Sequence, residues 1–222
     1  MKMKNRVLKT VILSGCIILL IITVNNCKAQ NIDSCKVHFK QSRLAQNAYY
    51  KTNKPNALKK ALAEVEQAMD CPLTRKAAVT QKIGLLFLLK DYRTGYTYVN
   101  SLNETDFWHT YEKEMEYNYF RAKEYETKGD ITNKNTYLNK AMHAIQAYID
   151  KEDATSKKMD FMAYSVLFWV MKEMGDVGKM KAEIDTLKKK YTDNAGDIDT
   201  FKSMYIDGNN VHSAAPTYTT YK

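Results

Sequence analysis

The 222-residue chain has little of the two residues that most often interrupt helices, with eight glycines and three prolines. It also lacks any sustained alternation of apolar and polar residues, which is the pattern of half-buried strands. Instead, apolar residues recur at spacings of three and four, for example at Val177, Met180, Ile184, Leu187 and Tyr191. This spacing forms one apolar face of an amphipathic helix. We therefore predict an all-α protein.

The sequence lacks the motifs of most enzyme classes. It contains no G-x-S-x-G, no phosphate-binding glycine loop, no G-x-G-x-x-G and no H-E-x-x-H. The four histidines are far apart in sequence and show no helical ligand spacing. Acidic pairs such as Glu112 and Glu116, one turn apart, are expected on an ordinary solvated helix face. The sequence therefore predicts no catalytic residue, no metal site and no cofactor.

No apolar run reaches the ~20 residues needed to span a bilayer as a helix. The longest, residues 11–24, follows a basic start and precedes Cys27-Lys28-Ala29. A basic start, a short apolar core and small residues at a cleavage point are typical of a secretory signal. We predict a signal peptide at residues 1–29, cleavage after Ala29, and an exported bacterial protein in the periplasm or outside the cell.

Two alternatives for the N-terminal segment remain open. Residues 7–24 could stay uncut as a membrane anchor. Alternatively, Leu13-Ser14-Gly15-Cys16 has the form of a lipobox, which would make Cys16 the acylated N-terminus of a lipoprotein. In either case the membrane would be reached only through this segment.

The net charge of +9 is not a property of the exported chain. The signal carries five of the 34 basic residues and no acid, which leaves 29 basic against 25 acidic residues, a net charge near +4. This is an ordinary solvated surface and does not predict nucleic-acid binding.

Short breaks divide the apolar stripes into helical pairs. Turns are expected at 53–56, 90–92, 128–130 and 174–176, and they recur about every 40 residues, as in solenoid repeats. One domain, residues 30–207, is expected. It comprises four pairs and a short capping helix: 34–70, 74–102, 105–150, 157–192 and 197–206. The tail, 208–222, lacks a helical pattern and is predicted to be disordered.

Two cysteines follow the predicted signal, Cys35 and Cys71. Cys35 begins the first predicted helix and Cys71 follows the second, so the two ends meet if these helices pack antiparallel. An oxidising compartment permits a disulfide between them. The alternative is two unrelated buried thiols.

The repeat resembles the tetratricopeptide repeat, a 34-residue helix–turn–helix unit. In the fourth pair, the turn Gly175-Asp176-Val177 matches the family's turn. Tyr164, Leu167 and Met171 match its large apolar positions, and Met180, Ile184 and Leu187 match its packing positions. In the second pair, Ile83-Gly84 and Phe87 match the family's Leu-Gly and aromatic, and Gly95 falls near its small residue. The resemblance implies a right-handed α-hairpin solenoid of about four pairs plus a C-terminal cap.

The resemblance also implies a binding groove on the first helix of each pair. The groove positions fall on Gln81, Glu116, Tyr119, Lys123, Ser165, Trp169 and Lys172. We expect a non-catalytic module that binds a protein or peptide in the cell envelope. The alternatives are a small helical enzyme or ligand-binding domain with a site not recognisable in sequence, and a structural envelope component held by its N-terminal segment.

Overall fold

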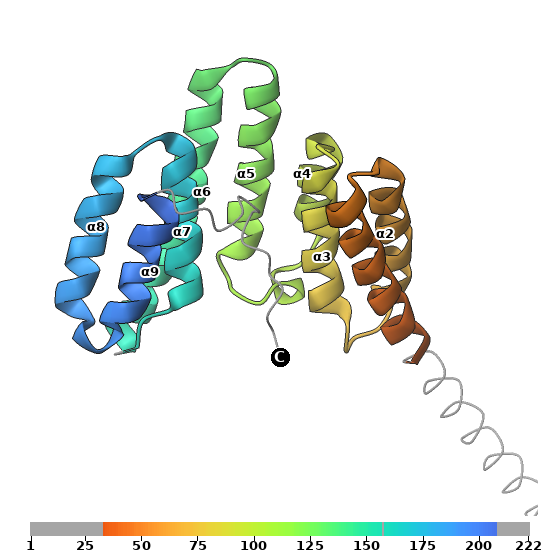
Figure 1. Ribbon diagram of the computed structural model, residues 1–222, viewed down its shortest axis with the longest axis horizontal. Coiled ribbons are helices and arrows are strands. Elements are labelled where there is room, and N and C mark those ends of the chain that lie inside the picture. Colours follow the sequence, from red (N-terminus) through yellow and green to blue (C-terminus); the bar gives the residue numbers. More distant parts are fainter. Residues whose placement is uncertain (1–32, 157, 208–222) are drawn as a thin grey trace, which may run out of the picture. The chain divides into compact units, whose positions relative to one another are not determined.

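The computed structural model describes residues 33–156 and 158–207 (Figure 1). The predicted signal, its cleavage, anchor and lipoprotein alternatives, and the predicted C-terminal tail lie outside these residues. Within them every regular element is a helix, so the all-α prediction is confirmed. The chain divides into two compact units, residues 1–78 and residues 79–222.

The described part of unit 1 is a disulfide-linked helical hairpin. The first helix spans residues 33–52, α2 spans Pro55–Ala68, and α3 (Arg75–Leu88) begins in this unit. The hydroxyl of Ser42 donates to the carbonyl of Ala61 at 2.7 Å. Cys35 and Cys71 form the predicted disulfide, with 6.1 Å between their Cα atoms. The first hairpin is therefore closed covalently where its two ends meet.

Unit 2 continues from α3 as a series of packed helices. In chain order the elements are α4 (Tyr92–Ser101), η1 (Glu104–Asp106), α5 (Glu112–Thr127), α6 (Ile131–Thr155), α7 (Phe161–Met174), α8 (Val177–Lys190), η2 (Thr192–Asn194) and α9 (Ala195–Tyr205). α5 packs against α4 and α6, α6 packs against α7, and α7, α8 and α9 pack together (Figure 1). The four predicted pairs and the capping helix are all present.

The hairpin turns share one backbone feature. Each contains a residue with positive φ, namely Asn53, Lys90, Gly129 and Gly175. In the last three turns an aspartate follows, and its side chain accepts a backbone N–H of the next helix. The left-handed residue ends one helix and the aspartate caps the next.

The third pair differs from its predicted bounds at both ends. Its first helix was expected from residue 105, but α5 begins at Glu112 after the short η1. Its second helix was expected to end at residue 150, but α6 continues through Thr155. Asp153 in this added turn accepts the hydroxyl of Tyr164 at 2.8 Å and also contacts Tyr191 and Lys190. These contacts join the end of α6 to α7 and α8.

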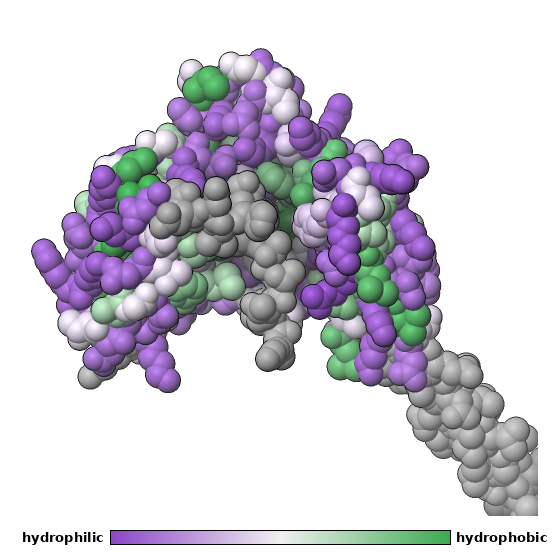
Figure 2. Space-filling model, viewed as in Figure 1, coloured by the Kyte–Doolittle hydropathy of each residue, from purple (hydrophilic) through white to green (hydrophobic). Residues whose placement is uncertain are grey.

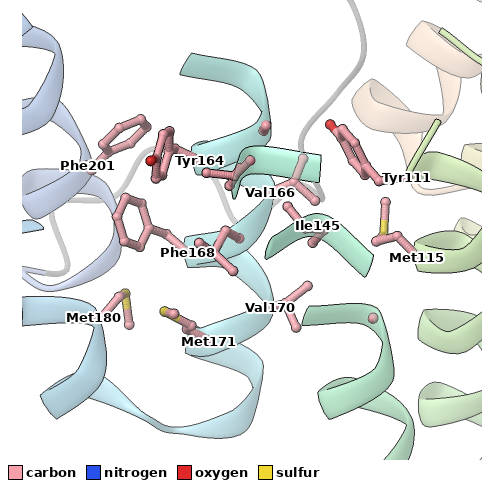
Figure 3. Close-up of a cluster of buried hydrophobic side chains, with 14 of the residues drawn as sticks. Tyr111, Met115, Ile145, Tyr164, Val166, Phe168, Val170, Met171, Met180 and Phe201 are labelled. Atoms are coloured by element: carbon pink, nitrogen blue, oxygen red, sulfur yellow. The ribbon is translucent and has the colours of Figure 1, made fainter. Parts of the chain in front are cut away.

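The core of unit 2 is centred on α7 (Figure 3). Phe168 points toward Phe201 of α9, with ring centroids 4.9 Å apart. Met171 points toward Met180 of α8, whereas Val166 and Val170 point toward α6. α7 is therefore covered on more than one side, which explains why its sequence is apolar almost all round.

A close approach between α4 and α5 requires Gly95. A Cβ atom built at this position would lie 2.3 Å from the buried ring of Phe120. Real Cβ atoms do not come this close to a neighbour. The ring of Phe120 therefore leaves no room for a side chain at position 95.

Candidate functional site

The predicted groove residues lie on α3, α5 and α7, but their exposures differ. Lys172 is exposed, and Gln81, Lys123 and Trp169 are half-buried. Glu116, Tyr119 and Ser165 are buried. The structure therefore brings some of these residues to the surface and places others within the packing.

Three aromatic rings connect α3, α5 and α7. The Tyr119 centroid lies 4.1 Å from that of Trp169 and 5.3 Å from that of Phe87. Tyr119 is 2% exposed, so the expectation that it faces solvent is wrong. Its ring fills the space between Phe87 and Trp169, and this burial raises the pKa of its hydroxyl far above the usual value.

Lys123 is held by two carboxylates. Its Nζ lies 2.7 Å from Glu126 Oε2 and 2.6 Å from Glu173 Oε2, and Lys134 Nζ lies 2.6 Å from Glu126 Oε1. Burial lowers the pKa of Lys123, but the hydrogen bonds to Glu126 and Glu173 outweigh it, so the pKa is raised. The Lys123 charge is compensated within the protein by Glu126 of its own helix and by Glu173 of α7.

Other predicted residues have structural roles. The hydroxyls of Ser165 and Tyr205 lie 2.8 Å apart and connect α7 to α9. Glu112 and Glu116, expected on a solvated face, are buried at 3% and 8% exposure. The buried carboxylate of Glu112 is satisfied by a hydrogen bond from the backbone N–H of Trp108 at 3.0 Å and by the His109 ring at 2.8 Å. These contacts hold the loop before α5.

A second cluster lies where α5 meets α4 and α6, and we call it the tyrosine–arginine patch. It comprises Tyr96 of α4, Tyr117, Arg121 and Tyr125 of α5, and Tyr137 of α6. The Arg121 guanidinium carbon lies 4.9 Å from the ring centroids of both Tyr96 and Tyr137. Arg121 Nη2 also donates to the Tyr125 hydroxyl at 3.1 Å.

The patch is ordered by its own contacts and remains open to solvent. Tyr125 and Tyr137 stack with centroids 5.4 Å apart, and Tyr96 meets Tyr117 edge to face at 6.0 Å. All five side chains are half-buried. Lysines lie over its rim: Lys140 Nζ is 4.9 Å from the centre of Tyr137, and Lys128 Nζ is 5.3 Å from that of Tyr125.

None of the residues of this patch is among the groove positions expected from the sequence. A signal was available, since Tyr117, Arg121 and Tyr125 recur every four residues and share one face of a helix. The partners Tyr96 and Tyr137 come from other helices, and no spacing in the sequence connects them to this face.

The described residues hold no group of three or more histidine, cysteine or acidic side chains placed to bind a metal ion. In the same part of the chain, no helix is both long and apolar enough to cross a bilayer. Comparisons with protein-family models, with curated proteins and with solved structures find no match.

Proposed function

We propose that this protein is an exported, non-catalytic helical-repeat module that binds a protein or peptide partner in the cell envelope. The finer architecture proposed is a right-handed solenoid of hairpins like those of the tetratricopeptide repeat. The helical pairs joined by tight turns support it. The Cys35–Cys71 disulfide is compatible with an oxidising, exported location.

The observation that carries the binding proposal is the composition and rigidity of the tyrosine–arginine patch. Tyrosine and arginine are enriched among the residues that supply most of the energy in protein interfaces. Their side chains here are already stacked on one another, so little rotamer freedom remains to be lost on binding. A surface of this kind favours a protein or peptide ligand.

The patch is a better candidate than the originally expected groove. On the groove side Tyr119 is buried, and Lys123 already has two carboxylate partners. A partner would have to displace Glu126 or Glu173 before it could use that charge. On the patch, the faces of the half-buried rings are accessible without such an exchange, whereas Lys128 on its rim is paired with Glu124 at 2.8 Å.

The proposal is tested by photo-crosslinking in the cells that export the protein. A photoreactive phenylalanine is placed at Tyr117 in the patch, at Lys172 on the groove side, or at Asp185 on α8 as an exposed control. We expect a discrete protein adduct from position 117 and none from 185. Adducts from position 172 alone would place the binding site in the groove. The absence of adducts from both 117 and 172 would contradict the binding function.

A further inference from the structure

Charge is distributed unevenly between the two units. Residues 33–78 contain nine basic and four acidic residues, a net charge of +5, whereas residues 79–207 contain 19 and 21, a net charge of −2. Within residues 33–60 the imbalance is seven basic residues to one acidic residue. The small positive charge of the exported chain is therefore concentrated on the first hairpin. Such asymmetry is typical of chains that contact nucleic acid or a membrane.

The first helix has a clear inner and outer side. Cys35, Ser42 and Ala45 are buried against the hairpin. Val37 and Leu44 are instead 55% and 52% exposed. They are seven positions apart, which places them two turns apart on the same side of a helix. This outer side therefore presents two large apolar side chains to solvent.

Cations surround these two side chains. Lys36, Lys40, Arg43 and Lys51 are on the same helix and are all exposed. Within the described part of the chain none of the four forms an ion pair. We call the outer side, defined by Val37, Leu44 and these four cations, the basic apolar face. Figure 2 shows hydrophobic residues among hydrophilic ones on the surface of unit 1.

We propose that the basic apolar face is a docking surface for an anionic lipid bilayer, on which the helix 33–52 lies parallel to the membrane plane. An interfacial helix combines basic side chains with apolar ones that enter the boundary between headgroups and acyl chains. Lysine stems can extend along the apolar layer while their ammonium groups reach lipid phosphates. Val37 and Leu44 supply the apolar contact, and the four cations supply the charge that anionic headgroups complement.

The position of this helix in the chain agrees with a bilayer partner rather than a nucleic acid. The apolar run 11–24 ends nine positions before Asp33. If that segment remains in a membrane, the first helix begins within reach of the same surface, since eight intervening residues span up to about 28 Å. If that segment is cleaved, the basic apolar face binds the exported protein to the membrane surface. A nucleic-acid backbone would offer no apolar contact to the exposed side chains of Val37 and Leu44.

Vesicle binding of the exported protein tests this inference. Vesicles of phosphatidylcholine alone are compared with vesicles containing equal parts of phosphatidylglycerol. We expect binding only to the anionic vesicles, and we expect it to weaken as salt is raised. Each surface cation contributes roughly fivefold to binding. The variant Lys36→Glu/Lys40→Glu/Arg43→Glu/Lys51→Glu should therefore bind at least about a hundredfold more weakly.

A matched control distinguishes an effect of the cations on the basic apolar face from an effect of the net charge of the protein. Lys179→Glu/Lys181→Glu/Lys189→Glu/Lys202→Glu makes the same charge change on exposed lysines of α8 and α9 and should bind nearly as the parent does. A Trp introduced by Leu44→Trp should be quenched by lipids brominated in their acyl chains, while one introduced by Asp185→Trp should not. Equal loss in both charge variants, no binding to anionic vesicles, or capture of an acidic protein without vesicle binding would overturn the proposal. None of these outcomes bears on the tyrosine–arginine patch.

Discussion

The guanidinium carbon of Arg121 lies 4.9 Å from the ring centroid of Tyr137, which joins the middle of α5 to α6 across the hairpin. A guanidinium over an aromatic face is attracted by the ring quadrupole. Burial lowers the pKa of Arg121, but the hydrogen bond from its guanidinium to Tyr125 and the neighbouring tyrosines raise it above its ordinary value. The charge is therefore permanent and fixed in position, which suits a binding surface.

Reduction of the Cys35–Cys71 disulfide should destabilise the protein. A link between residues 36 positions apart restricts the unfolded chain and is worth about 4 kcal/mol in the chain-entropy model. Reduction, or the variant Cys71→Ala, should lower the thermal midpoint, measured by circular dichroism. Lys59→Ala on the exposed side of α2 is the control and should leave the midpoint within about a degree. An unchanged midpoint after complete reduction would contradict this account of unit 1.

Tyr119→Ala should be strongly destabilising. Removing a ring packed between Phe87 and Trp169 leaves a cavity, and such truncations usually cost about 3–5 kcal/mol. Urea unfolding would measure this loss in free energy. The control Tyr50→Ala removes a ring that is 47% exposed and should change stability by less than ~1 kcal/mol. Similar values for the two variants would show that Tyr119 is not part of the core.

Gly95→Ala and Gly84→Ala should have opposite effects, although both place alanine in a helix. The new methyl group at position 95 would meet Phe120, and overpacking of this kind costs about 1–3 kcal/mol. A Cβ atom at position 84 would meet nothing within 4 Å beyond its own stretch of helix, so alanine should stabilise by about 0.5–1 kcal/mol through helix propensity. Urea midpoints that shift in the same direction would contradict the close approach of α4 and α5.

The pH dependence of stability should include a contribution from His109. Its hydrogen bond to Glu112 raises its pKa, against the effect of burial. A histidine with a raised folded-state pKa adds stability that is fully present below about pH 6.5 and is lost as pH rises through the folded-state pKa. Unfolding free energies measured from pH 5.5 to 8.5 should show this loss.

The variant His109→Gln should reduce the loss of unfolding free energy between pH 5.5 and 8.5. His143→Gln, on an exposed position of α6, serves as the control and should leave the profile close to that of the parent. If the two variants gave the same pH profile as the parent, the His109–Glu112 pair would have no role in holding the loop before α5.

Local features of the fold were predictable from sequence, because they depend on neighbouring residues. The pairs of helices follow from apolar spacing, and the turns at Gly129 and Gly175 follow from glycine and the aspartate after it. The extra turn of α6 was not predictable, because its support is Asp153 bonding to Tyr164 and Tyr191, which are distant in sequence. The start of α5 at Glu112, seven residues after the expected position, follows from the loop that Glu112 holds through its bonds to Trp108 and His109.

The candidate site was less predictable than the fold. Tyr119 and Tyr117 are two positions apart on the same helix, yet one is buried between neighbouring rings and the other is half-exposed. The sequence alone cannot distinguish them, because the difference depends on which helices pack on each side of α5. The resemblance placed Tyr119 and Lys123 on an open surface, whereas Phe87, Trp169 and Glu173 occupy it.

Partner affinity of Arg121 variants tests the central claim most directly. The partner identified by crosslinking is titrated against the parent, Arg121→Ala and Arg121→Lys, with Arg93→Ala as a control at an exposed arginine of α4. Lysine keeps the charge but cannot reproduce the planar stacking of arginine. We predict that both Arg121 variants stay folded and bind at least about tenfold more weakly, equivalent to ~1.4 kcal/mol, while Arg93→Ala binds as the parent does. Unchanged affinity in folded Arg121→Ala would contradict the assignment of binding to the tyrosine–arginine patch.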